Sequence, residues 1–554
     1  MKSLNRDMSP GIDLTKRQAT GAVRISHPIY HDLLPPCNNA CPAGEDIQAW
    51  LALAQAGAYH QAWQSLIADN PFPAIHGRVC YHPCETSCNR GELDSSVSIH
   101  AVERFLGDQA LEHGWTANAA PASGKRVLII GAGPCGLSAA WHLAMQGHAV
   151  EVHEAGPVAG GMLHFGIPAY RLPRDVLHQE IARLETLGIR IVLNHKVEDV
   201  LLEQTQGNFD AVLLAIGAQV ARHVDIPARD AAKVYDAVAL LRAAGTGEKP
   251  LLGRRVTVYG GGNTAIDAAR TARRLGAEDA MIIYYRDQAH MSALPFETEE
   301  ALEEGIKIRW LSSIREMDGQ SLEVEKMILD ADGKAQPTGE METLPADTLI
   351  LALGQSSDTG FLRSMADLTF AADGTVIVGD DMQTGHPGVF AGGDMTPGNR
   401  TVTSATGNGK HAARHIDAWL RGGTWQRPAR HAMVGFADLH LPVYSDALPS
   451  RQTSLPLDQR DDFSEVVGGL SPAQAQHEAR RCLSCGNCYE CDSCFAACPE
   501  NAIIKLGPQQ GYAVNMNLCS GCAVCFDQCP CHAIDMVSET TAAAAPDAVE
   551  ESHP

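Results

Sequence analysis

Basic residues are too few in this 554-residue chain to balance its acidic ones. Lys and Arg number 43 against 66 Asp and Glu, which leaves a formal net charge of -23 at pH 7. Such a chain has no excess of cations with which to neutralise phosphates, so nucleic-acid binding is not expected. The net charge does not exclude local basic patches.

Long apolar runs are also scarce. The opening residues, MKSLNRDMSPGIDLTKRQ, contain no apolar core of a secretion signal. The run from Val127 to Gly147 is long enough to suggest a membrane span, but its three glycines at turn spacing favour a strand, a loop and a helix. We therefore expect a cytoplasmic protein with no membrane span.

Cysteine is absent from the middle of the chain. None of the 17 Cys lies in residues 150–481, whereas five lie in residues 37–88 and eleven in residues 482–531. Without a signal peptide ahead of them, such clusters indicate metal sites in a reducing compartment rather than disulfides. Cys135 stands alone in a glycine turn and is expected to pack against a strand, so disulfide reductase chemistry is not expected. The 23 His show no spacing typical of a metal site.

The segment KRVLIIGAGPCG is a hydrophobic strand that runs into Gly131-x-Gly133-x-x-Gly136 and an apolar helix. In this fingerprint the first Gly permits a tight turn, the second lets the backbone approach a pyrophosphate, and the third packs helix against strand. The next strand, AVEVHEA, ends at Glu154, where a carboxylate accepts hydrogen bonds from ribose hydroxyls. Strand, helix, second strand and acid in this order predict a dinucleotide site.

A second segment, GRRVTVYGGGNTAIDAARTARRLGAEDAMIIYYRDQ, repeats the pattern as Gly260-x-Gly262-x-x-Ala265, with Asn263 inside the turn. Two dinucleotide folds in one chain indicate a carrier of hydride between a flavin and a nicotinamide. In that reaction the protein positions two rings rather than supplying an acid or a base. We therefore expect one of the two fingerprints to bind a flavin and the other a nicotinamide cofactor.

The residues after the second strand of this segment bear on the choice between NADH and NADPH. Arg286 can pair with a 2′-phosphate, but Asp287 follows it, and its charge would repel that group. Arg273 and Arg274 can compensate, although a row of arginines on a helix is also typical of a solvated face. The sequence favours NADH slightly.

The C-terminal cysteines have the spacing of a bacterial two-cluster ferredoxin. Each of two runs reads Cys-x2-Cys-x2-Cys-x3-Cys-Pro, and the fourth Cys of each run ligates the other 4Fe–4S cluster. Paired zinc sites explain this spacing poorly. Cys531 is left over and is expected to be a buried thiol. The eight predicted ligands are Cys488, Cys491, Cys494, Cys498, Cys519, Cys522, Cys525 and Cys529.

About residues 35–425 resemble the small subunit of glutamate synthase and the flavin half of dihydropyrimidine dehydrogenase. The resemblance rests on the two fingerprints, on AGPVAGGMLHFGIPAYRLP after Glu154, and on PGVFAGGDMTPG far downstream. It implies FAD at the first fingerprint and NAD(P)H at the second. It also implies that Gly161 lies along the first fingerprint and that Asp394 reaches the ribityl chain or the pyrophosphate. Otherwise Asp394 is a turn residue between glycines.

The N-terminal segment CNNACPAG … NPFPAIHGRVCYHPCETSCNRG belongs to the same resemblance. It implies one 4Fe–4S cluster held by Cys41, Cys80, Cys84 and Cys88.

A further N-terminal cluster is incomplete by the same comparison. In the resembled family it begins with a Cys-x2-Cys pair before the position of Cys37, and that pair is missing here. RCLSCG, just ahead of the ferredoxin runs, looks like the missing piece. Otherwise its two Cys are spare thiols and Glu103 is a solvated helix residue. The predicted ligands of this fourth cluster are Cys37, Cys482, Cys485 and the Glu103 carboxylate.

The expected fold is multidomain α/β, with an α-helical iron–sulfur domain, two nested Rossmann-like domains and an α+β ferredoxin-like domain. The expected segments are a tail (1–35), the helical iron–sulfur domain (36–118), the FAD domain in two parts (124–248 and 346–425), the NAD(P) domain (249–345), a linker (426–476), the two-cluster ferredoxin (477–537) and a disordered tail (538–554).

These expectations point to an electron-transfer flavoenzyme that moves electrons between NAD(P)H and three or four 4Fe–4S clusters through FAD. The partner is expected to be a ferredoxin or a catalytic subunit of the 2-oxoacid:ferredoxin oxidoreductase, aldehyde oxidoreductase or glutamate synthase type, within a hetero-oligomeric complex. The alternative is a non-catalytic redox-sensing or assembly subunit, although such a subunit has no need of both nucleotide fingerprints.

Overall fold

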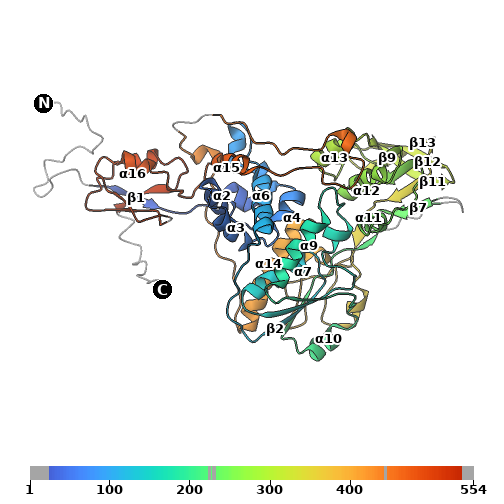
Figure 1. Cartoon of the computed structure of the whole chain (residues 1–554), viewed down its shortest axis with the longest axis horizontal. Coiled ribbons are helices and arrows are strands. Elements are labelled where there is room, and N and C mark those ends of the chain that lie inside the picture. The colour runs from blue at the N-terminus through green and yellow to red at the C-terminus, as the bar shows by residue number, and fades with distance from the viewer. Residues whose placement is uncertain (1–23, 222–225, 228–232, 442–445, 509, 540–554) are drawn as a thin grey trace, which may run out of the picture.

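A computed structural model describes residues 24–221, 226–227, 233–441, 446–508 and 510–539. In Figure 1 a small cysteine-rich lobe lies at one end and a helical unit lies in the middle. One α/β unit lies at the other end, and a second lies below the helical unit. The predicted multidomain α/β fold is confirmed.

The first α/β unit is built on a five-stranded parallel sheet in the order β16-β5-β2-β3-β4. The central strand β2 has the sequence RVLII, and four of its five side chains are buried, as expected for a strand covered on both faces. Helix α7 follows the glycine turn with Pro134 at its first position. The elements are β2 (Arg126–Ile130), α7 (Pro134–Met145), β3 (Ala149–His153), α8 (Met162–Phe165), α9 (Arg174–Glu185), β4 (Arg190–Val192), α10 (Val200–Gly207), β5 (Ala211–Leu214), β16 (Val389–Ala391) and α14 (Val402–Leu420).

The second α/β unit has a parallel sheet in the order β10-β9-β8-β14-β7 and a three-stranded antiparallel sheet, β11-β12-β13. It is larger than the predicted NAD(P) domain, 249–345, because β14 pairs with both β8 and β7. The four side chains of β14 are all buried, as an inner strand of a parallel sheet requires. The elements are β7 (Lys233–Asp236), α11 (Ala237–Gly245), β8 (Arg255–Tyr259), α12 (Asn263–Arg274), β9 (Asp279–Ile283), α13 (Pro295–Glu303), β10 (Lys307–Arg309), β11 (Ser312–Asp318), β12 (Ser321–Leu329), β13 (Ala335–Pro345) and β14 (Thr348–Leu351). A two-stranded sheet pairs β6 (Val220–Ala221) with β15 (Gln355–Ser356).

The helical unit contains short helices whose ends carry the cysteines. Residues 47–67 form two helices, α2 and α3, and Gly57 takes a left-handed φ of 78° between them. Helix α15 begins inside the predicted linker 426–476 and packs on α2 and α6. The elements are α1 (Pro36–Ala40), α2 (Ile47–Gln55), α3 (Tyr59–Ile67), α4 (Pro73–Val79), α5 (Pro83–Thr86), α6 (Ile99–His113) and α15 (Pro472–Arg480).

The cysteine-rich lobe is closed by a strand from the other end of the chain. Strand β1 pairs antiparallel with β19, from Ser26 opposite Ser538 to Tyr30 opposite Ile534. The expectation that residues 1–35 form a tail is therefore wrong for this strand, whose short SHPIY sequence carries no strong strand signal. Residues 1–23 and 540–554 lie outside the described residues. The elements are β1 (Ser26–Tyr30), α16 (Ser493–Ala497), β17 (Ile503–Lys505), β18 (Tyr512–Val514), α17 (Val524–Asp527) and β19 (Ile534–Ser538).

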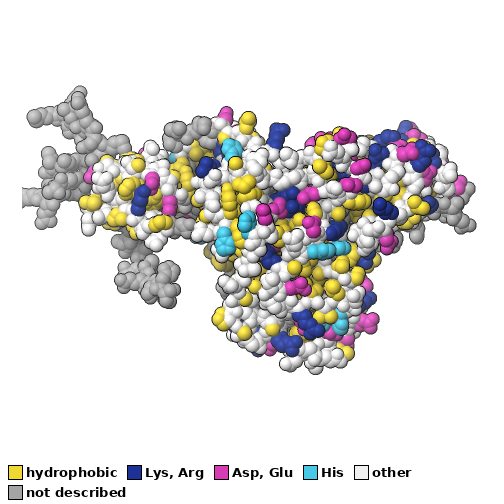
Figure 2. All heavy atoms as spheres, viewed as in Figure 1, with side chains coloured by type: hydrophobic (Ala, Val, Ile, Leu, Met, Phe, Trp, Pro, Cys, Tyr) yellow, Lys and Arg dark blue, Asp and Glu magenta, His cyan; other side chains and the backbone are white. Residues whose placement is uncertain are grey.

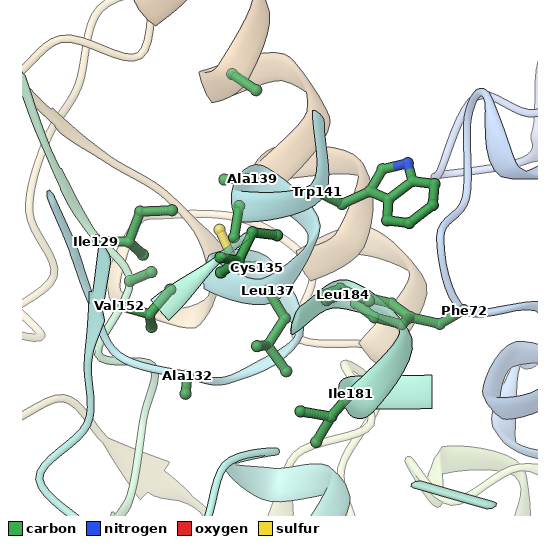
Figure 3. Packing of buried hydrophobic residues seen from close by; sticks show 14 of the residues in the cluster. Phe72, Ile129, Ala132, Cys135, Leu137, Ala139, Trp141, Val152, Ile181 and Leu184 are labelled. Atoms are coloured by element: carbon green, nitrogen blue, oxygen red, sulfur yellow. The ribbon is translucent and has the colours of Figure 1, made fainter. Parts of the chain in front are cut away.

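The hydrophobic core of the first α/β unit continues into the helical unit (Figure 3). Ile129 and Val152 project from the sheet, while Trp141 of α7 and Phe72 of the helical unit lie in the same cluster. The Trp141 indole donates a hydrogen bond to the Ile67 carbonyl at 3.2 Å. The two units are therefore packed as one body, which fixes the cysteines relative to the sheet.

Basic and acidic side chains are interspersed on the face of the molecule shown in Figure 2. No extended basic area is visible among the described residues of that face.

Candidate functional site

Two cavities meet at the carboxyl end of β2. They have volumes of about 180 and 410 Å³, and both are lined by Gly131, Glu154 and Gly217. Gly133, Gly161 and Asp394 line the first cavity alone. Because both cavities share one wall, they form one elongated site at the position where a parallel α/β sheet binds a dinucleotide.

The three glycines of the first fingerprint have different surroundings. A Cβ at Gly131, whose φ is 108°, would lie 2.4 Å from the Ala215 carbonyl oxygen, and one at Gly136 would lie 2.0 Å from the Gly131 oxygen. A Cβ at Gly133 would meet nothing within 4 Å. The outer glycines therefore permit the turn itself, whereas Gly133 leaves room inside the first cavity.

Two carboxylates border these cavities. Glu154 is buried and accepts hydrogen bonds from the backbone N–H groups of Ala132 at 2.8 Å and Gly156 at 2.7 Å, which fix its orientation. Burial raises the pKa of Asp394 to about 6. Cys135 is buried in the core beside the first cavity, and burial raises its pKa.

The second fingerprint opens toward the same space. Gly260 has a φ of 152°, and its Cβ would lie 2.3 Å from the Ala352 carbonyl oxygen. Gly262 caps α12, Ala265 is fully buried under the turn, and Asn263 lines the first cavity. The two fingerprints therefore face each other across the first cavity, as hydride transfer between two bound rings requires.

Four charged residues bear on nicotinamide specificity. The Arg286 guanidinium lies over the Tyr285 ring, with its carbon 5.2 Å from the ring centroid. The Asp287 carboxylate accepts hydrogen bonds from the backbone N–H and the Nδ1 of His290, and these bonds lower the pKa of Asp287. Arg273 donates to backbone carbonyls, and Arg274 pairs with Glu304. Both Arg273 and Arg274 are therefore already engaged and do not offset the negative charge of Asp287.

One group of potential iron ligands, which we call the inner site, lies beside the first cavity. Its side chains are those of Cys41 after α1, Cys80 after α4, Cys84 in α5 and Glu103 in α6. Burial raises the pKa of Cys80 to about 12, and the nearby Glu103 carboxylate raises it further. Burial also raises the pKa of Glu103, and the Glu45 carboxylate raises it further. Such a set of buried and partly buried donors suits a cationic group that offsets their charge.

A second group, the bridging site, joins the two ends of the chain. Its side chains are those of Cys37, Cys88, Cys482 and Cys485, which all line one small cavity. Burial raises the pKa of Cys37, and Cys482, Cys88 and Cys485 raise it further. Four partly buried thiols that line one cavity match the donor set of a 4Fe–4S cluster.

This grouping differs from the predicted ligand sets, in which Cys88 belongs with Cys41, Cys80 and Cys84, and Glu103 with Cys37, Cys482 and Cys485. Gly77 of α4 lies against α6, and a Cβ there would be 2.4 Å from the Arg104 Cβ. This close approach brings Glu103, the residue before Arg104, to the end of α4 at Cys80. Asn89 donates a hydrogen bond to Cys485 Sγ at 3.4 Å, which holds Cys88 at the bridging site.

The C-terminal lobe brings together cysteines from both ferredoxin runs. Cys494, Cys529 and Cys491 all lie near Cys488, whose pKa is raised to about 11, mainly by burial. Cys498 and Cys529, the fourth residues of the two runs, accept backbone hydrogen bonds at 3.2 and 3.3 Å from the residues four positions later. Cys529 of the second run thus lies near Cys488 of the first run.

Cys80 connects the cysteine sites to the nucleotide cavity. Val79 and Tyr81, on either side of it, both line the first cavity. Thr403, at the start of α14, donates a hydrogen bond to Cys80 Sγ at 3.2 Å. At the other end of the helical unit, only two residues separate Cys485 from Cys488. The inner site therefore lies next to the cavity, and the bridging site lies next to the ferredoxin runs in sequence.

Three hydrogen-bond donors to these sulfurs carry no sequence signal, since they lie hundreds of positions away. Thr403 and Asn89 are two of them, and the third is Tyr30, whose hydroxyl donates to Cys494 Sγ at 3.2 Å. Tyr30 lies on β1, the strand that the sequence did not indicate. Hydrogen bonds to ligand sulfurs raise the reduction potential of an iron–sulfur cluster.

We expect Tyr30→Phe to lower the potential of the cluster at Cys494. A neutral hydrogen bond contributes about 0.5–1.5 kcal/mol, which corresponds to about 20–60 mV for one electron. A redox titration followed by electron paramagnetic resonance measures the shift. Tyr512→Phe is the control, because Tyr512 stacks on Tyr30 but donates to Asp492. Equal shifts in both variants would show that the sulfur contact is irrelevant.

Two known protein families match parts of this chain. Residues 125–410 match the pyridine nucleotide-disulphide oxidoreductase family, and residues 31–115 match dihydropyrimidine dehydrogenase domain II, 4Fe-4S cluster. The chain belongs to the pyridine nucleotide-disulphide oxidoreductases. Its NAD(P), FAD and 4Fe–4S cofactor classes and its function as an electron-transferring oxidoreductase are thereby confirmed.

Curated relatives of this oxidoreductase are named as subunits or chains of larger enzymes. The NADP(+)-dependent formate dehydrogenase subunit beta of Moorella thermoacetica is 35% identical over 81% of this chain and 70% of its own. The NADPH-Fe(3+) oxidoreductase subunit beta of Geobacter sulfurreducens is 32% identical over 81% and 75%. The glutamate synthase [NADPH] small chain of Escherichia coli is 33% identical over 70% and 89%, which confirms the resemblance to that family.

None of the helices among the described residues has both the length and the apolar character that crossing a membrane requires.

Proposed function

We propose that this oxidoreductase exchanges electrons between NADPH and a partner protein, with the C-terminal lobe as the point of exchange. The observation that carries the proposal is the position of Cys80 between Val79 and Tyr81, which line the nucleotide cavity. This position supports the inner site as the first acceptor after the flavin. The bridging site and the ferredoxin ligands then continue toward the surface.

The residues around the cavities suit FAD. Gly133 leaves space for a pyrophosphate, Glu154 is oriented to accept from ribose hydroxyls, and Asp394 lies at the wall of the first cavity. When bound, the flavin would accept a hydride and pass its two electrons on singly. The protein's own part is to hold the two rings together and to exclude water, for which the buried wall around Gly131 is suited.

We propose four 4Fe–4S clusters. Cys41, Cys80, Cys84 and Glu103 would hold one, and the four cysteines of the bridging site another. The ferredoxin runs would hold two more, each run completed by the other's fourth Cys. Reductive titration of the anaerobic holoprotein should take up about six electrons per chain, two for FAD and one for each cluster. An uptake of about five would mean three clusters.

We propose NADPH as the donor, with Arg286 at the 2′-phosphate. The slight preference for NADH rested on the charge of Asp287, and that carboxylate is engaged by His290. The relatives from Moorella, Geobacter and Escherichia coli are named for NADP(+) or NADPH, which supports the same choice. An arginine stacked on a tyrosine is a suitable partner for a phosphate.

Arg286→Ala is expected to reduce the ratio of kcat/KM for NADPH over NADH by about 10–100-fold, because a charge-assisted contact contributes about 1.5–3 kcal/mol. Steady-state dye reduction with each nucleotide measures this ratio. Arg273→Ala is the matched control, since Arg273 is bound to the carbonyls of Ala277 and Glu278. A similar drop in both variants would place the 2′-phosphate elsewhere.

The partner is proposed to be a ferredoxin or a catalytic subunit of the 2-oxoacid:ferredoxin oxidoreductase, aldehyde oxidoreductase or glutamate synthase type, and the compartment is the reducing cytoplasm. Large apolar side chains are exposed beside the ferredoxin ligands, including Phe495 after Cys494 and Leu518 before Cys519. Exposed apolar side chains are typical of a protein-binding surface. These exposed side chains support the C-terminal lobe as the surface that binds the partner.

A further inference from the structure

Two histidines and an aspartate from opposite ends of the chain meet on one face of the β1–β19 ladder. His31 follows β1, and its backbone N–H bonds to the Ala533 carbonyl at 3.2 Å, which continues the ladder. Asp535, two residues beyond Ala533 on β19, is therefore a diagonal neighbour of His31 on the same face. His532, in the turn before β19, completes the group.

The three side chains face one another without hydrogen bonds between them. His31 Nε2 lies 3.6 Å from Asp535 Oδ2, and His532 Nε2 lies 3.8 Å from Asp535 Oδ1. Both separations are too long for a hydrogen bond. His31 Nε2 is also a buried atom with no hydrogen-bond partner among the described residues. A buried imidazole nitrogen without a partner is costly, so the group lacks something that binds it.

We propose that His31, His532 and Asp535 bind a zinc ion that fastens β1 to the C-terminal lobe. Imidazole and carboxylate are ordinary zinc ligands, and their ligand atoms here lie within 4.8 Å of one another. Tetrahedral zinc with bonds of about 2.0–2.1 Å needs ligand atoms about 3.3–3.4 Å apart, so the two separations must close by only a few tenths of an ångström. The Asp535 side chain is 45% exposed, which leaves the fourth position open to water.

His532 is held in place for this role by its neighbours. The rings of His440 and Phe526 lie 5.7 and 5.8 Å from the His532 ring, and they pack edge-on against each other at 4.8 Å. The Nδ1 of His440 hydrogen-bonds to the Phe526 carbonyl at 2.9 Å, which fixes this arrangement. A fixed imidazole loses little freedom on binding a metal.

An ion at this position would stabilise the strand that tunes the neighbouring cluster. Successive side chains of a strand point to opposite faces, so His31 faces the zinc group while Tyr30 faces Cys494. Tyr30 is opposite the fully buried Ile534. The zinc would thus be structural, with no part in electron transfer.

The test is zinc analysis of holoprotein purified anaerobically from zinc-supplemented cells. We expect about one zinc per chain, and X-ray absorption should show only nitrogen and oxygen neighbours at about 2.0–2.1 Å. Sulfur neighbours at about 2.3 Å would place the zinc in a cysteine site and overturn the proposal. So would a wild-type zinc content near zero at full iron content.

His31→Asn and Asp535→Asn should each lose most of the zinc while keeping their iron, which also reports that the lobe has folded. His386→Asn is the matched control, because His386 and Asp367 form another His–Asp pair, 3.2 Å apart, that belongs to no such three-residue group among the described residues. Zinc retained in His31→Asn at the wild-type level would overturn the assignment.

Discussion

Gly133→Val is expected to give a folded protein with no flavin. A Cβ at this position meets no protein atom within 4 Å, so the substitution strains neither the turn nor the core. The added side chain would instead occupy the first cavity, where the pyrophosphate needs to approach the backbone. Flavin content per chain should fall more than about tenfold, and nucleotide-driven dye reduction should fall with it.

Two comparisons make this result specific. Gly423 lies after α14 and lines neither cavity, so the Gly423→Val protein should keep its flavin. Gly131→Ala should instead impair folding, because its Cβ would lie 2.4 Å from the Ala215 carbonyl. The flavin released by acid from the wild type should run as FAD. A Gly133→Val protein with normal flavin would place the pyrophosphate away from this glycine.

Replacement of both Cys482 and Cys485 by Ser is expected to interrupt the relay without stopping the flavin. One 4Fe–4S cluster should be lost, so iron should fall from about sixteen to about twelve atoms per chain. Dye reduction by the nucleotide should be largely retained, since the flavin cavity is untouched. Reduction of the ferredoxin clusters by the nucleotide, followed by electron paramagnetic resonance, should slow drastically.

The same experiment separates the two possible ligand sets for Cys88. Adding Cys88→Ser to the double variant should remove no further iron if the three residues share the bridging site. A further loss of about four atoms would return Cys88 to the inner site, as the sequence had indicated. Cys531→Ser is the control for thiol loss, because Cys531 lies 3.8 Å from Cys529 Sγ but belongs to no proposed ligand set.

Features coded by contiguous residues were predictable from the sequence. Each fingerprint contains its strand, turn and helix in one stretch, and Glu154 follows at a fixed distance, so both nucleotide sites were indicated. The ferredoxin runs were recognisable for the same reason. The association of Cys37 with Cys482 was also predicted, because the resembled family has a Cys-x2-Cys pair before Cys37 that this chain lacks there.

Features set by tertiary packing were not predictable. The proposed exchange of Cys88 and Glu103 between sites depends on how closely α6 approaches α4 at Gly77, which no local pattern encodes. His31 and His532 are 501 positions apart, so no spacing rule could join them. Likewise, the apolar segment LILALGQ (349–355) would suit a buried strand in the sheet of either α/β unit. Only its pairing with β8 assigns β14 to the sheet of the second unit.

The pairing of the two chain ends has a consequence for how the protein is made. Ribosomes synthesise the chain from its N-terminus at about 5–20 residues per second. Cys482 is therefore made about 20–90 s after Cys37. The inner site needs no such wait, since all its ligands precede residue 104. Cells would therefore load iron into this protein in two stages, early at the inner site and after release at the bridging site. Cells that run short of iron between the two stages would accumulate chains that oxidise nucleotide but have no connection to their own ferredoxin lobe.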